Sequence, residues 1–205
     1  MAIKNYKKIY TELNKSKFLK LQIIVLFVTT YIDWVIMPYV TKLEGLYLPV
    51  FMISFFMLIG ATDGLIQPLF KKVKIYNIYL FIIILDIIQV ISYSLCNYDM
   101  VVFTYVILSI FTLQAITFEI SRIHTVDFMK NEIDIKDYLI VRSFFVSSAI
   151  IGGAVTAMIF DYFGIKLTSM LIFLSVLGVF AVIIEYKLYK KFKVAFANLS
   201  ISPTL

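Results

Sequence analysis

Two carboxylates and two amides lie within long apolar runs of the sequence, where polar side chains are unusual. Asp33 is followed by Trp34 in one run, and Asp86 lies in another with Gln89 one helical turn further on. Gln114 lies in a third run. Ionisable groups at membrane depth are costly and usually face the interior of a helix bundle. We predict that these five residues bind a substrate or protons; the alternative is that they form interhelical hydrogen bonds that only fix the packing.

Charged residues near the ends of two runs favour an ion pair. Glu119 and Arg122 are three residues apart, a spacing that places both on one face of a helix. Arg142 falls at the same depth in the next run and can also reach Glu119. We interpret these three residues as a structural or gating ion pair rather than as a binding site.

Small residues recur at four-residue spacing in the run 138–160. One stripe consists of Ser148, Gly152 and Thr156, and the adjacent stripe consists of Ala149, Gly153 and Ala157. The run 46–70 contains a similar pair, Gly60 and Gly64. Small side chains let membrane helices approach closely. We therefore predict tight helix packing at Gly60, Gly64, Ser148, Gly152 and Gly153.

The sequence contains no motif typical of an enzyme, a metal site or a cofactor site. The patterns G-x-S-x-G, H-E-x-x-H, C-x-x-C and the phosphate loop are all absent. The single histidine, His124, has no second histidine, cysteine or carboxylate pair at the spacing of metal ligands. We predict that the chain is not an enzyme and that it uses no metal and no cofactor.

The candidate residues require membrane-spanning helices to position them. The 205 residues are 61% hydrophobic and 16% charged, with a mean hydropathy of +0.94, whereas soluble domains are roughly 45–50% apolar. A helix needs roughly 20 apolar residues to cross a bilayer. Six segments have this length: 18–40, 46–70, 75–96, 101–123, 138–160 and 165–188. We predict an all-α polytopic membrane protein with one six-helix transmembrane domain at 18–188.

The distribution of basic residues predicts the orientation of the six spans. Of 19 lysine and arginine residues, all but Lys42 and Lys166 fall on one side of the predicted membrane. Positively charged flanking segments resist translocation, so both chain ends are expected in the cytoplasm. We predict an amphipathic basic tail at 1–17 that lies on the lipid bilayer, and a second cytoplasmic tail at 189–205. The net charge of +6 is explained by this orientation and does not indicate nucleic acid.

The layout resembles one half of a major facilitator superfamily transporter, with a basic connector after the second span and a longer polar connector after the fourth. Gly64 and the basic residues of 71–74 are similar to the family signature between helices two and three. The segment 148–153 resembles the glycine-rich motif in helix five of the family's drug–proton antiporters. Asp33 falls where several exporters have an acidic residue in helix one. The resemblance implies a gating role for Asp63, which lies beside Gly64.

This resemblance implies a half-size exporter in the cell membrane. Transporters of this family are usually built from two six-helix halves, so we expect a homodimer or a second membrane subunit. We predict that the protein moves a small amphipathic or peptidic compound, with protons as the candidate coupling ion. The alternative is a non-transporting binding protein, such as an immunity or accessory protein, because the arginine typical of the family's fourth helix is missing from the outer part of 101–123. The abundance of Ile, Lys, Phe, Asn and Tyr is typical of low-G+C bacteria.

Overall fold

The computed structural model describes residues 17–44, 73–97, 99–129 and 134–201, and the regular structure in these ranges is entirely helical. The α-helices are α2 (Lys17–Glu44), α5 (Ile75–Ser92), α6 (Met100–Met129), α7 (Ile135–Tyr162) and α8 (Leu167–Ile201), and the 3₁₀ helix η1 (Tyr93–Asn97) extends α5. All five α-helices are long and apolar enough to cross a membrane. The prediction of an all-helical, multi-pass membrane protein is therefore confirmed.

The second predicted span, 46–70, lies outside the described residues. Gly60, Asp63 and Gly64 lie in that segment, so their predicted roles in packing and gating stay predictions. The tail 1–17 lies outside the described residues except for Lys17, which begins α2.

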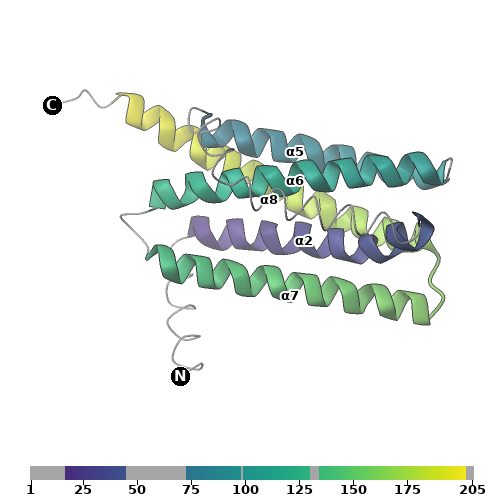
Figure 1. Cartoon of the computed structure of the whole chain (residues 1–205). Coiled ribbons are helices and arrows are strands. Elements are labelled where there is room, and N and C mark those ends of the chain that lie inside the picture. Colours follow the sequence, from purple (N-terminus) through teal and green to yellow (C-terminus); the bar gives the residue numbers. More distant parts are fainter. Residues whose placement is uncertain (1–16, 45–72, 98, 130–133, 202–205) are drawn as a thin grey trace, which may run out of the picture.

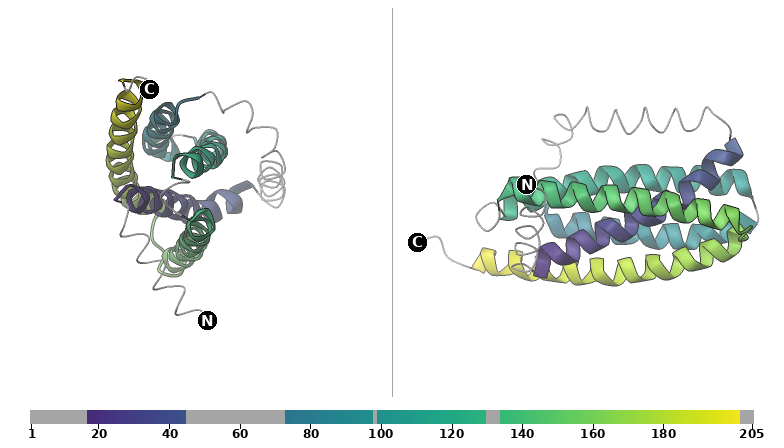
Figure 2. Two further views of the ribbon diagram at one scale, coloured as in Figure 1. Left: turned by 90° about the vertical axis from the view of Figure 1, so that its left-hand side faces the viewer. Right: turned by 90° about the horizontal axis from the view of Figure 1, so that it is seen from below.

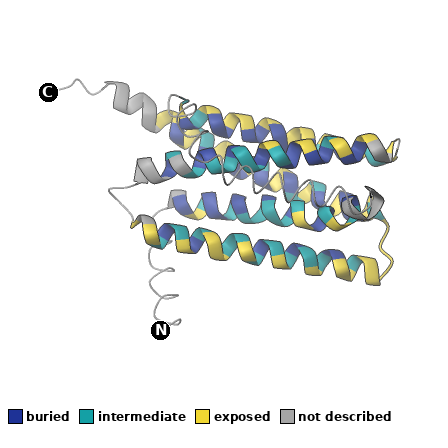
Figure 3. Cartoon of the chain, in the orientation of Figure 1, coloured by how far each residue is buried: buried dark blue, intermediate teal, exposed yellow. Residues whose placement is uncertain are grey.

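The five helices form an elongated bundle in which helices distant in sequence lie side by side (Figure 1). Helix α5 packs against both α6 and α8, and α2 packs against α7 and α8. The end-on view of Figure 2 shows α7 at the edge of this arrangement, and its main neighbour is α2. A smaller share of α7 is buried than of any other described span, and Figure 3 shows exposed residues along its whole length.

Helices α2, α5 and α7 begin, and α6 and α8 end, at the same end of the bundle (Figure 1). Basic side chains gather there, and we call it the basic end; its described lysines and arginines are Lys20, Lys74, Arg122, Lys136, Arg142, Lys187, Lys190, Lys191 and Lys193. Among the described side chains, Lys166 is the basic residue of the opposite end. The positive-inside rule predicts that the basic end faces the cytoplasm.

Several helices are longer than their predicted spans. Helix α2 continues through Glu44, α6 through Met129 and α8 through Ile201, so parts of the expected connectors at 41–45 and 124–137, and most of the tail 189–205, are helical. Hydropathy marks only the part of a helix that lies in lipid, whereas helical hydrogen bonding continues into water until a breaker intervenes.

A glycine turn reverses the chain between α7 and α8. Gly164 has a φ angle of +62°, which is in the left-handed region that residues with a Cβ atom rarely adopt. The Ile165 N–H donates to the Phe160 carbonyl at 2.9 Å, and the Gly164 N–H donates to the Asp161 carbonyl at 3.1 Å. These two bonds form a Schellman motif. The motif ends α7 sharply and makes α7 and α8 antiparallel.

The small residues of α7 face α2. A Cβ atom on Gly153 would lie 2.8 Å from both the Tyr31 carbonyl oxygen and the Trp34 Cβ atom, so the two backbones nearly touch at this point. Ala149 and Ala157, four residues to either side, are buried. A Cβ atom on Gly152 would lie 3.7 Å from the Tyr31 ring, which is an ordinary contact. Gly153 is therefore the point of closest approach between α2 and α7.

The neighbouring stripe lies at the margin of this contact. The Tyr31 hydroxyl and the Thr156 hydroxyl are 2.8 Å apart and share a hydrogen bond between the two helices. The Ser148 hydroxyl instead donates to the Phe144 carbonyl of its own helix at 2.8 Å. The stripe thus contributes to the α2–α7 contact through Gly152 and Thr156, whereas the Ser148 hydroxyl is satisfied within α7.

Accessibility to a membrane-impermeant thiol reagent tests the orientation. Lys136 at the basic end and Lys166 at the opposite end are both exposed. In a Cys96→Ala background we expect the Lys166→Cys variant to be labelled in intact cells, and the Lys136→Cys variant to be labelled only after the membrane is permeabilised. Labelling with the reverse pattern would contradict the predicted orientation.

Two neighbouring glycine substitutions test the α2–α7 contact. Gly153→Ala introduces a methyl group where the α2 backbone leaves no room, and overpacking of this kind costs about 1–3 kcal/mol. Gly152→Ala meets only an ordinary contact and gains helix propensity, so its stability should equal or exceed that of the wild type. Thermal unfolding of the purified protein in detergent measures both, and equal stability of the two variants would show that the close approach is absent.

Candidate functional site

A layer of polar side chains crosses the bundle between two apolar clusters. The basic-end cluster comprises Val25, Ile75, Ile78, Tyr79, Ile82, Ile120, Ile184, Leu188 and Phe192. The opposite-end cluster comprises Ile32, Val35, Ile36, Val40, Tyr93, Phe103, Ile107, Leu108, Phe111, Met170, Leu171 and Leu174. Polar groups between such layers are shielded from water, so their mutual interactions are stronger than at a surface.

Asp86 lies on α5 in the middle of this layer, and its side chain is buried. The amide nitrogen of Gln114, on α6, donates one hydrogen bond to Asp86 Oδ1 at 2.6 Å and another to Gln89 Oε1 at 2.7 Å. Gln114 is also buried, so α5 and α6 each contribute a polar side chain to an interface that excludes solvent. These bonds connect α5 to α6 and orient the Asp86 carboxyl group.

Gln89 extends the network to α2. Its amide nitrogen donates to Asp33 Oδ1 at 3.3 Å and to the Tyr93 hydroxyl at 3.1 Å. Asp33 is half-buried, whereas Gln89 is buried. The structure therefore brings together four of the five residues predicted to bind substrate or protons, namely Asp33, Asp86, Gln89 and Gln114.

Trp34 faces elsewhere. Its Cβ atom contacts the site of Gly153 on α7, and its side chain is 37% exposed. Since successive residues of a helix point about 100° apart, Trp34 lies on a different face of α2 from Asp33. The contact of Trp34 with Gly153 is part of the packing of α2 against α7.

Glu185 of α8 completes the polar layer, and it was not among the predicted site residues. Its side chain is fully buried. The carboxyl groups of Asp86 and Glu185 face each other closely enough to form a hydrogen bond when one of them is protonated. In the sequence, Glu185 lies two residues before Lys187 and resembles an interfacial residue. Its spacing from Ala181, Leu188 and Phe192, all buried, would have placed it on the inner face of α8.

Several buried oxygen atoms in this layer have no hydrogen-bond donor from the described side chains. They are Asp86 Oδ2, Gln114 Oε1, Glu185 Oε1 and Glu185 Oε2. A buried acceptor without a donor costs about 1–3 kcal/mol, and more when it is charged. Among the described groups, a proton donor to these oxygens is available only if one of the carboxyl groups is protonated; water or a ligand can also supply one.

The charge of the layer is unbalanced. Within the described ranges, the buried polar side chains carry carboxyl, amide or hydroxyl groups, and none of them is basic. No group of three His, Cys, Asp or Glu side chains among the described residues has the geometry to hold a metal ion. Asp33, Asp86 and Glu185 together can take up protons or an organic cation, which would neutralise negative charge that no described basic side chain offsets.

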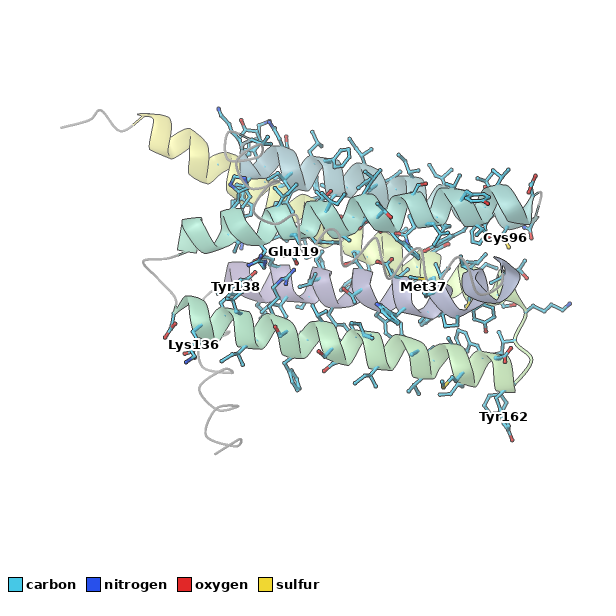
Figure 4. The ribbon with its side chains drawn as sticks, viewed as in Figure 1. Met37, Cys96, Glu119, Lys136, Tyr138 and Tyr162 are labelled. Carbon is cyan, nitrogen blue, oxygen red and sulfur yellow. The ribbon has the colours of Figure 1, made fainter. Side chains whose placement is uncertain are left out.

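A second polar group lies nearer the basic end and joins α6 to α7. Glu119 accepts from Arg122 Nε at 2.5 Å within α6 and from Arg142 Nη2 of α7 at 2.6 Å. Figure 4 shows Glu119 and Tyr138 close to this end and Cys96 at the opposite one. The three side chains are partly exposed, with 34% for Glu119, so solvent weakens the pair. The geometry matches the predicted ion pair, and it links two helices that otherwise have little contact.

The two arginines provide a matched test of this link. Arg142→Gln removes the Glu119 bond between α6 and α7, whereas Arg122→Gln removes the Glu119 bond within α6. We expect Arg142→Gln to lower the free energy of unfolding by roughly 1 kcal/mol, the upper part of the range for solvent-screened pairs, and Arg122→Gln to have a smaller effect. Thermal unfolding in detergent measures the difference, and the opposite ranking would show that the interhelical bond is not the stabilising one.

In comparisons with protein-family models, curated protein sequences and solved structures, nothing matches this chain.

Proposed function

We propose that the protein is a proton-coupled membrane transporter in which Asp86 and Glu185 form the proton-binding site. The observation that carries this proposal is the buried pair of facing carboxyl groups on α5 and α8. Two carboxylates have no proton to donate to each other, so the pair is held together only when it shares a proton. Release of that proton leaves two like charges in a dry interior and favours a rearrangement of α5 relative to α8.

The energetic cost of the polar layer supports a functional role over a purely structural one. An Asp side chain at the centre of a membrane helix costs roughly 2.5–3.5 kcal/mol for insertion. Apolar side chains of similar volume stabilise a buried interface as well as charged ones, or better. Asp86 and Glu185 have no buried basic partner in the described ranges, and Asp33 is joined to them through amides. Such a set of carboxyl groups contributes little to packing and is suited to exchanging protons.

The network offers a direct connection from the proton site to a substrate. Asp33 on α2 is half-buried and is joined to Asp86 through the amides of Gln89 and Gln114. A change in the charge of the Asp86–Glu185 pair therefore alters the hydrogen bonding of Asp33. We place the substrate near Asp33 and propose a small amphipathic or peptidic compound that carries a cationic group.

The proposed working unit is two copies of the chain or this chain with a second membrane subunit. This part of the proposal depends on the likeness to half of a major facilitator superfamily transporter, whose substrate path lies between two six-helix halves. Two-fold pairing is the commonest way for one kind of chain to close an assembly.

Proton flux in proteoliposomes tests the function. With an imposed pH gradient and a panel of cationic amphipathic compounds and short peptides, we expect the wild type to move protons when a transported compound is present. Asp86→Asn and Glu185→Gln keep the shape of each side chain but remove its ability to exchange a proton, so each should lower the flux at least about a hundredfold.

The control for these variants is Asp161→Asn, which neutralises an exposed carboxylate in the last turn of α7 and should leave the flux unchanged. Wild-type flux in both carboxyl variants would contradict the assigned site. A wild type without flux that instead recovers a stoichiometric protein partner from detergent would favour the non-transporting binding protein.

A further inference from the structure

A small pocket lies between the proton-binding pair and the basic end. It is lined by residues of α2, α5, α6 and α7, namely Gln22, Tyr79, Ser121, Arg122, Tyr138 and Arg142 among others. The Gln22 amide nitrogen donates to the Thr125 hydroxyl at 2.8 Å, and the Tyr138 hydroxyl donates to Gln22 Oε1 across a longer 3.5 Å. The pocket volume of about 10 Å³ corresponds to a single water molecule, for which these polar side chains offer donors and acceptors.

Tyr79 lies between this pocket and the proton-binding pair. Its side chain is 1% exposed, and its ring stacks on the Phe192 ring at a centroid distance of 5.2 Å. Its hydroxyl group lies near Gln22 and Thr125 but has no hydrogen bond of good geometry to any described side chain. A buried tyrosine hydroxyl normally finds a partner, and the groups available to this one among the described side chains are Gln22 and Thr125.

The side chains around Tyr79 otherwise form an apolar barrier. The basic-end cluster, to which Tyr79 belongs, includes Ile82, one helical turn before Asp86, and Ile184, which precedes Glu185 in the sequence. Tyr79 precedes Asp86 by seven residues, a rise of about 10 Å along α5. It is also near enough to Glu185 to interact with it electrostatically. Tyr79 therefore contributes a hydroxyl group to the apolar layer that a proton must cross.

We propose that Tyr79 relays protons between the pocket at the basic end and the Glu185 carboxyl group. This inference rests on the proposed proton-coupled function. In the inward step the Tyr79 O–H proton passes to a Glu185 oxygen, directly or through one water, and the Tyr79 oxygen takes a proton from a pocket water. One O–H bond breaks and one forms at Tyr79, so the phenol is unchanged. Glu185 becomes a neutral carboxylic acid, and the pocket water recovers its proton from the aqueous phase.

The charged groups around this route favour passage of a proton rather than a metal cation. Asp33 of α2, Asp86 of α5 and Glu185 of α8 attract positive charge at its inner end. Arg122 of α6 and Arg142 of α7 line the pocket and repel a permanent cation, although Glu119 partly offsets them. A proton passed between hydroxyl groups does not require a hydrated ion to approach the two arginines.

Tyr79→Phe tests the relay because it removes only a hydroxyl group, one that has no well-formed hydrogen bond to a described side chain. The matched control is Tyr186→Phe, since Tyr186 is adjacent to Glu185 in the sequence but is 49% exposed and lies under Lys190. We expect Tyr79→Phe to slow proton flux in proteoliposomes at least about tenfold, and Tyr186→Phe to leave it unchanged. Gel filtration of each variant verifies that it is folded.

A second measurement separates the relay from the transport function. After a drop in pH, infrared difference spectra of the protein in detergent follow the carbonyl band of Glu185, which is identified by its loss in Glu185→Gln. Tyr79→Phe should slow the appearance of this band by a similar factor. Wild-type kinetics in Tyr79→Phe would overturn the relay even if flux depends on Glu185. Slowed kinetics without any wild-type flux would support the relay and overturn the transport function.

Discussion

The bundle depends on how it satisfies carboxyl groups that it holds away from water. Asp86 and Glu185 are buried between two apolar clusters, where an unpaired charge is far more costly than at a surface. The amides of Gln89 and Gln114 supply donors to Asp86 and Asp33, and the remaining carboxyl oxygens need a proton or a ligand. The hydrogen bonds that connect α2, α5 and α6 thus also lower the energetic cost of burying the carboxyl groups.

The two sides of the bundle are joined by different physical means. Helices α5, α6 and α8 surround the polar layer, and their contact includes hydrogen bonds that depend on protonation. Helix α7 packs on α2 through Gly153 and the alanines beside it, and that contact is independent of pH. A change of charge in the polar layer therefore acts first on the contact between α5 and α8, and it does not act directly on the α2–α7 contact at Gly153.

The polar groups at the basic end set the other boundary of the site. Glu119 joins α6 to α7 through Arg142, and Gln22 contacts Thr125 and Tyr138 beneath it. These groups connect α2, α6 and α7 around a pocket to which α5 contributes Tyr79. Tyr79 and Ile82 belong to the apolar basic-end cluster. The bundle thus has polar chemistry at two depths and a thin apolar barrier between them.

The sequence by itself determined the class of protein and the approximate places of five described spans, because long apolar runs have few alternatives to membrane helices. It also indicated Asp33, Asp86, Gln89 and Gln114, since polar residues stand out in such runs. Hydropathy did not predict that α6 and α8 extend beyond the predicted spans. Only the tertiary structure decided that Glu185 faces Asp86, that Trp34 packs near α7, and that Tyr79 lies beside the pocket. The rotation of each helix about its axis depends on contacts with the side chains of other helices, so the local sequence pattern does not predict it.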